Sequence, residues 1–175
     1  MLPKIFKPKN EYDLVRLGRD NDGGYLVEKN SLTDSKSLIS FGLSYDWSFE
    51  KHFYKIKNCP IHCYDPSVKY SNIKKFSRKS IIDLFKIKNL LNKNFLKINI
   101  NNILLFNDYK KFFSNKVIHY DSSIGIGINK INFSEVINRI ELYPTFLKID
   151  IEGSEYRILD DILKHQDKIS GLVIE

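Results

Sequence analysis

The stretch TFLKIDIEGSEYRIL, residues 145–159, carries the strongest structural signal in the chain. It begins with a short apolar run that is typical of a buried strand. Asp150 and Glu152 follow where this strand is expected to end, and Gly153 then permits a tight turn. A helical apolar stripe comes next, with Ser154 as the expected N-cap. The stretch therefore places two carboxylates at the carboxyl end of a strand that leads into a helix.

These carboxylates have two interpretations. In open α/β sheets, ligands bind at the carboxyl ends of the strands, so Asp150 and Glu152 could belong to a binding site. Alternatively, both side chains merely cap the next helix and face water, which is the better interpretation of an isolated D-x-E pattern. The remaining strands of the chain favour the binding site.

Length and composition indicate one globular domain over residues 1–175. Hydrophobic residues make up 42% of the chain and charged residues 28%, which excludes a disordered or collagen-like protein. No apolar run reaches the length of a membrane span, and the first residues lack the apolar segment of a secretory signal. Two cysteines cannot build a disulfide framework, so a cytoplasmic location is expected.

The net charge of +7 is compatible with a nucleic acid, an anionic membrane or an acidic substrate as partner. The lysines are spread along the chain among Asn and Ile, without a block of like charges. This distribution indicates a compositional bias more than a basic patch. The charge is therefore weak evidence for any partner, and no DNA partner is expected.

The pattern of strands and helices predicts an α/β fold. Residues 1–35 are expected to form an N-terminal segment with a β-hairpin whose turn lies at residues 20–24. Strands are predicted at 38–41, 61–65, 117–120, 145–151 and 171–174. Helices are predicted at 47–57, 81–91, 103–113, 133–142 and after Ser154, while 95–100 alternates like a strand but could join the helices. Such alternation predicts a parallel sheet of order 3-2-1-4-5 with helices on both faces.

Further polar residues and a glycine follow the first two predicted strands. Gly42 ends the first strand, and Asp46 is a plausible N-cap for the next helix. Asp65 follows the second strand, at the position that receives ribose hydroxyls in Rossmann-like domains. Because carboxyl ends of parallel strands share one edge, these residues should converge with Asp150 and Glu152.

A zinc site is not expected from the cysteines and histidines. Cys59, His62 and Cys63 do not have the spacing of a standard zinc finger. Strand alternation also directs His62 away from Cys63. The sequence therefore favours buried core cysteines and no metal ligands.

Four segments resemble those of FkbM-type S-adenosylmethionine-dependent methyltransferases. LKIDIEGSEYRIL at 147–159 resembles the family signature, and SFGLSYDWSFE at 40–50 is similar to a cofactor motif of a subgroup with D-W-S-F-E. YDPS at 64–67 is similar to the acidic motif of this subgroup, and RLGRDNDGGYLV at 16–27 resembles its N-terminal segment. Together these segments span most of residues 16–159.

The resemblance implies a Rossmann-like methyltransferase sandwich that binds S-adenosylmethionine and methylates a hydroxyl oxygen. It implies that Asp65 accepts hydrogen bonds from the ribose, that Asp150 lies near the amino group or methyl, and that Glu152 lies beside the acceptor. The turn formed by Asp22, Gly23 and Gly24 would be a lid. The implied cofactor-binding residues are Gly42, Leu43, Ser44, Asp46, Ser48, Phe49, Asp65, Pro66 and Asp150.

Asp150 and Glu152 are the candidate catalytic residues, because methylation of an alcohol requires a group that accepts its proton. The two carboxylates could instead hold a divalent cation that orients a diol. The metal-free mechanism is favoured because the sequence identifies no third oxygen ligand. Alternatively, Asp150 orients the cofactor without accepting a proton.

The resemblance is incomplete at the C-terminal end. Family members usually continue past LVIE with a helix and an antiparallel hairpin, whereas this sequence ends at Glu175. The edge beside the fifth strand would then be bare and could mediate self-association. Three functions follow as alternatives. The first is O-methylation of a sugar, glycan precursor or other small polyhydroxylated acceptor; the second is RNA methylation; the third is a truncated, non-catalytic cofactor-binding or interaction domain.

Overall fold

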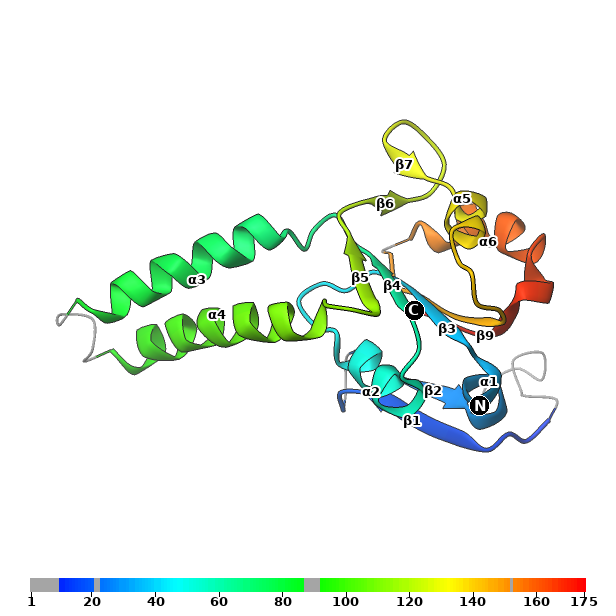
Figure 1. Cartoon of the computed structure of the whole chain (residues 1–175), viewed down its shortest axis with the longest axis horizontal. Helices are drawn as coiled ribbons and strands as arrows, with labels where there is room; N and C mark the ends of the chain where they lie inside the picture. Colours follow the sequence, from blue (N-terminus) through cyan, green and yellow to red (C-terminus); the bar gives the residue numbers. More distant parts are fainter. Residues whose placement is uncertain (1–9, 21–22, 87–91, 152) are drawn as a thin grey trace, which may run out of the picture.

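A five-stranded parallel sheet forms the centre of the molecule in the computed structural model, which describes residues 10–20, 23–86, 92–151 and 153–175 (Figure 1). The strands are β3 Ser37–Phe41, β4 Ile61–Tyr64, β5 Val117–Tyr120, β8 Thr145–Ile149 and β9 Ile169–Ile174. Their order is β5-β4-β3-β8-β9, and every neighbouring pair is parallel. The predicted α/β class and the predicted order 3-2-1-4-5 are confirmed.

Six α-helices and two pairs of short strands surround this sheet among the described residues. The helices are α1 Lys29–Asp34, α2 Ser48–Lys57, α3 Tyr70–Leu84, α4 Lys93–Phe112, α5 Phe133–Asn138 and α6 Glu155–Leu163, and η3 Gln166–Lys168 is a 3-10 turn. The short strands are β1 Leu14–Gly18, β2 Gly24–Glu28, β6 Ser123–Ile124 and β7 Lys130–Ile131. None of the helices described is long and apolar enough to cross a lipid bilayer.

The core has two parts, one on each face of the sheet. Because successive side chains of a strand point to opposite faces, Leu38 packs with α2 and the hairpin, whereas Ile39 packs with α5 and α6. All five residues of β3 are buried, as are all five of β8. The prediction of helices on both faces is therefore confirmed.

The N-terminal hairpin is also confirmed. Strands β1 and β2 pair antiparallel, from Leu14 opposite Glu28 to Gly18 opposite Gly24. Helix α1 follows the hairpin directly and was not predicted. The side chain of Glu28 accepts hydrogen bonds from the backbone amides of Asn30 and Ser31, which caps this short helix.

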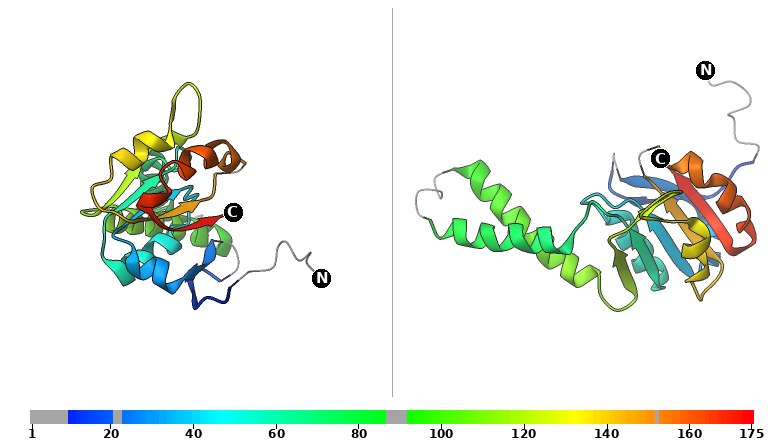
Figure 2. Two further views of the ribbon diagram at one scale, coloured as in Figure 1. Left: turned by 90° about the vertical axis from the view of Figure 1, so that its right-hand side faces the viewer. Right: turned by 90° about the horizontal axis from the view of Figure 1, so that it is seen from above.

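Helices α3 and α4 form a two-helix arm that projects from the sheet between β4 and β5 (Figures 1 and 2). The possible strand at 95–100 is wrong, because α4 begins at Lys93 and runs through it. Asn92 caps this helix by accepting a hydrogen bond from the amide of Phe95. Ile98 and Ile100 alternate with polar residues, as the side chains of a half-buried strand would. In the structure both lie on the helix with exposed side chains.

Two further helix boundaries differ from the prediction. The helix expected to start at residue 81 starts at Tyr70 and ends at Leu84, while residues 87–91 lie outside the described residues. The helix expected at 133–142 ends at Asn138. At 133–142, the apolar residues Ile140 and Leu142 beyond the helix were counted as part of its stripe.

Candidate functional site

A cavity of about 320 Å³ lies at the carboxyl ends of β3, β4 and β8. The strand order reverses between β3 and β8, which is the topological switch point where open α/β sheets bind ligands. Five of the predicted cofactor residues line this cavity: Gly42, Ser44, Asp65, Pro66 and Asp150. The structure therefore brings together residues from three separate sequence motifs.

Gly42 lines the cavity at a point where the chain after β3 runs close to the backbone of Asp150 after β8. It has a φ angle of +80°, and a Cβ atom at this position would lie 1.7 Å from the carbonyl oxygen of Asp150. The amide of Gly42 donates to the carbonyl of Tyr64, and the amide of Asp150 donates to that of Phe41. Backbone contacts thus join the ends of three strands, and only glycine fits at their meeting point.

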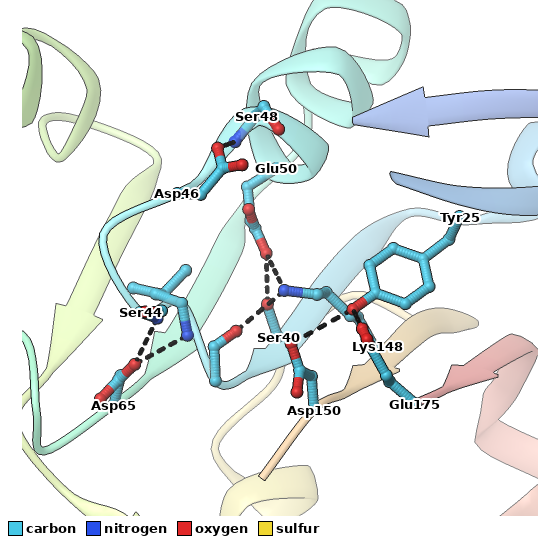
Figure 3. Close-up of polar contacts among 12 residues, drawn as sticks. Tyr25, Ser40, Ser44, Asp46, Ser48, Glu50, Asp65, Lys148, Asp150 and Glu175 are labelled. Carbon is cyan, nitrogen blue, oxygen red and sulfur yellow. Dashed lines mark hydrogen bonds and ion pairs between the residues drawn. The ribbon is translucent and has the colours of Figure 1, made fainter. Parts of the chain in front are cut away.

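Asp65 is almost fully buried, and its carboxylate holds the loop after β3 (Figure 3). Oδ2 accepts hydrogen bonds of 2.8 Å from the amides of both Leu43 and Ser44. Oδ1 accepts from the amide and the hydroxyl of Ser67, at 2.7 and 2.6 Å. Burial alone would raise the pKa of Asp65, but these donors outweigh it and hold the pKa below its ordinary value.

These four hydrogen bonds change the expected environment of Asp65. A carboxylate has about four lone-pair positions, so a ribose hydroxyl would have to replace one of the present donors. The Ser67 hydroxyl is the donor that can rotate away, because the other three are backbone amides. Asp65 lines the cavity but is only 5% exposed, so little of its carboxylate is open to a ligand.

A buried ion pair, Lys148 with Glu50, lies next to Gly42, which lines the cavity (Figure 3). Lys148 Nζ lies 3.3 Å from Glu50 Oε1 and donates a 2.8 Å hydrogen bond to the carbonyl of Gly42. The hydroxyl of Ser40 donates to the same Glu50 oxygen at 2.5 Å. Burial disfavours the ammonium of Lys148, but the carboxylates of Glu50 and Asp150 outweigh this effect and raise its pKa. Lys148 is therefore a buried charged residue that contacts the cavity wall through the carbonyl of Gly42.

Tyr25 connects the hairpin to the same edge. Its hydroxyl lies within hydrogen-bond distance of Asp150 Oδ2, at 3.2 Å, and of the side chain of Glu175, and its single proton can be donated to either carboxylate. Its ring centroid lies 5.5 Å from Lys148 Nζ, within the range of a cation–π contact. Burial raises the pKa of Tyr25, and the two neighbouring carboxylates raise it further. Tyr25 thus stays protonated and helps to orient Asp150.

The other predicted cofactor residues do not line the cavity. Leu43 and Phe49 are buried in the core between α2 and the sheet. Asp46 accepts a 3.0 Å hydrogen bond from the amide of Ser48, and it also pairs with Arg19 of the hairpin loop. The predicted N-cap role of Asp46 is wrong, because Trp47 occupies the N-cap position of α2. A cofactor role for these residues stays a prediction.

Two predicted residues cannot be placed. Glu152 and Asp22 lie outside the described residues. Gly23 is described, and a Cβ atom there would lie 2.8 Å from Asp46 Oδ2, so the hairpin loop approaches the start of α2. The lid assignment stays a prediction. Ser154 occupies the N-cap position of α6 without a side-chain capping bond.

Four further residues line the cavity without having been predicted as site residues. They are Ser122, Ser123, Ile124 and Lys130, which come from the segment after β5. The serines could have been found, because they follow a strand end just as Asp65 and Asp150 do. Lys130 has no such local signal, since the pairing of β6 with β7 brings it to the cavity.

The remaining candidate ligands do not gather into a metal centre. Among the described residues, no group of three or more His, Cys, Asp or Glu side chains could hold a metal ion. Cys59 and Cys63 are buried free thiols, and burial raises the pKa of Cys59 to about 11. No protein-family model matches the chain, and no curated protein or solved structure matches it either.

Proposed function

We propose that this protein binds S-adenosylmethionine in the cavity at the switch point of a Rossmann-like sheet and methylates a hydroxyl group of a small polyhydroxylated acceptor. The main support is the convergence of Gly42, Asp65 and Asp150 on one cavity. Each of these residues belongs to a different segment that resembles the FkbM-type methyltransferases. The choice of a sugar-like acceptor rests on that resemblance alone.

The chemistry of the cavity wall is compatible with this cofactor. S-adenosylmethionine combines positive sulfonium and ammonium groups with a carboxylate and two ribose hydroxyls. Asp150 offers a negative charge to the sulfonium and ammonium groups, and Lys130 offers a positive charge to the carboxylate. Ser44 and Ser122 offer hydroxyls for hydrogen bonding. The volume of about 320 Å³ lies at the lower end of the range of small-molecule sites.

The residues of this chain would act mainly by positioning and proton transfer. When bound, the cofactor supplies an electrophilic methyl carbon. Asp150 would accept the proton that the acceptor hydroxyl loses during the transfer. Tyr25 orients the Asp150 carboxylate through its hydrogen bond to Oδ2. Lys148 holds the backbone of Gly42 in place at the cavity wall.

Calorimetric titration with S-adenosylmethionine and S-adenosylhomocysteine tests the proposal. We expect micromolar binding of both compounds, and we expect Ser122→Val to weaken it by about tenfold through loss of a hydrogen bond. Asp160→Asn is the matched control, because Asp160 is exposed on α6 outside this cavity. Absence of binding by a cooperatively folding chain would refute the cofactor assignment.

Turnover separates an enzyme from a binding domain. Asp150→Asn should reduce methyl transfer to a panel of polyols and sugars at least a hundredfold, because it removes the proposed proton acceptor. Because Asp150→Asn also removes the negative charge proposed to face the cofactor, turnover is compared at saturating cofactor. Cofactor binding without methyl transfer to any hydroxyl acceptor would instead support the non-catalytic alternative.

A further inference from the structure

The positive charge of the protein is concentrated on the α3–α4 arm. Residues 70–112 contain ten Lys or Arg and two Asp, a net charge of +8, whereas the whole chain carries +7. The remainder of the chain is therefore slightly negative, at −1. Residues 70–112 form one continuous segment, so its net charge reflects the small number of Asp and Glu in it. Helices α3 and α4 place this segment on one projecting element (Figures 1 and 2).

The arm also has an unusual distribution of polar and apolar side chains. Ser77, Ser80 and Asn99 are buried, and the Asn102 side chain donates a 3.0 Å hydrogen bond to Ser80 across the two helices. Seven large apolar side chains of the arm are between 44% and 83% exposed: Phe76, Ile81, Ile82, Phe85, Ile98, Ile100 and Leu104. A helical hairpin that faces only water normally shows the opposite pattern.

The arm is anchored at its base. The Trp47 ring packs against Tyr109 and Phe113, and its indole N–H donates to Asp108. Lys51 of α2 forms an ion pair with the same aspartate. Beyond this base, α3 and α4 pack mainly on each other, so their outer surfaces face away from the sheet (Figure 2). The exposed apolar and cationic side chains are thus presented on a supported projection.

We propose that the α3–α4 arm binds the surface of an anionic lipid bilayer. Its apolar side chains would enter the boundary between headgroups and acyl chains, and its lysines and arginine would contact the lipid phosphates. This proposal rests on the arm alone and does not depend on cofactor binding.

Two other partners explain the surface less well. Nucleic acids bind cations and stack on aromatic rings, but they offer no apolar environment to exposed Ile and Leu side chains, which are five of the seven. A second copy of the chain would bring two strongly positive arms together, and these would repel each other. An anionic bilayer complements both the charge and the apolar side chains.

Vesicle flotation tests the electrostatic part. We expect binding to vesicles of phosphatidylcholine and phosphatidylglycerol in equal amounts, no binding to phosphatidylcholine alone, and weaker binding at higher salt. An anionic membrane attracts each nearby Lys or Arg enough to change affinity about fivefold. The triple variant Lys75→Gln/Arg78→Gln/Lys79→Gln should therefore bind roughly a hundredfold more weakly.

A control variant removes the same charge elsewhere. Lys36→Gln/Lys55→Gln/Lys164→Gln changes three exposed lysines outside the arm and should retain most of the binding. Equal losses in the two triple variants would overturn the assignment to the arm. Binding of the wild-type chain to an oligouridylate but not to anionic vesicles would overturn the proposal in favour of RNA. Urea unfolding checks that every variant is folded.

Fluorescence tests the apolar part. Phe85→Trp places an indole on the arm at a site that is 83% exposed, whereas the natural Trp47 is only 2% exposed. Anionic vesicles should shift the emission of this variant to shorter wavelength, and Ile82→Gln should weaken binding at least threefold. Ile128→Gln, at an exposed site outside the arm, is the control. Binding without a spectral shift and without loss in Ile82→Gln would overturn insertion.

Discussion

The carboxyl-end edge of the sheet, around Lys148, and the α3–α4 arm both bury polar side chains. The buried side chains are charged at the sheet edge and neutral in the arm. At the sheet edge, a full ion pair between Lys148 and Glu50 is buried together with Ser40. In the arm, the buried polar groups are small and neutral, such as Ser80 with its partner Asn102. The charges of the arm lie on its outside instead.

This difference has a consequence for stability. A buried charge loses its hydration, so it remains stable only if its partner is held accurately in place. Lys148 comes from β8, Glu50 from α2 and Ser40 from β3, so their contacts tie three elements of the sheet edge together. The neutral contacts of the arm join only two successive helices and tolerate substitution more easily. The sheet edge should therefore be rigid and the arm more permissive.

The largest effect is expected from breaking the buried ion pair. Glu50→Gln or Lys148→Met should each lower the free energy of unfolding by about 3–5 kcal/mol, because one charge remains buried without its partner. The double variant should lose clearly less free energy of unfolding than the sum of the losses in the two single variants. Urea unfolding measures all three. The exposed pair Lys29–Asp13 is the control, with an expected coupling below about 1 kcal/mol, and simple additivity at Glu50 and Lys148 would contradict the interpretation.

A smaller effect is expected from the backbone contact at Gly42. Gly42→Ala should lower the free energy of unfolding by about 2–3 kcal/mol, because the new Cβ would collide with the carbonyl of Asp150 at an already unfavourable φ angle. Gly153→Ala is the matched control, since φ there is +82° and no described atom lies within 4 Å of its Cβ position. Thermal and urea unfolding of both variants should show the difference. Equal losses would mean that the φ angle alone matters.

The smallest effect is expected inside the arm. Ser80→Ala should lower the free energy of unfolding by about 1 kcal/mol, because it removes one neutral hydrogen bond. Combining it with Asn102→Leu should recover most of this loss, since both polar partners are then gone. Urea unfolding of the two single variants and the double variant gives the coupling energy. A coupling as large as that between Glu50 and Lys148 would abolish the contrast between arm and sheet edge.

Local patterns in the sequence predicted much of the fold. The strands of the sheet are short apolar runs bounded by turn residues, so their positions and order could be inferred from backbone preferences and crossover rules. The same rules placed Gly42, Asp65 and Asp150 at one edge, because carboxyl ends of parallel strands meet there. They failed at 95–100, where two exposed isoleucines imitate the alternation of a strand.

Contacts between distant residues required the tertiary structure. Glu50 and Lys148 are 98 positions apart, and neither side chain carries a local signal for the other. Asp65 was placed at the correct strand end, yet its burial by Leu43, Ser44 and Ser67 could not be inferred from position alone. The net charge of +8 in residues 70–112 can be counted in the sequence, but its position on a projecting arm required the tertiary structure. Local sequence patterns report what each segment prefers on its own, whereas desolvation and pairing depend on which segments the folded chain brings together.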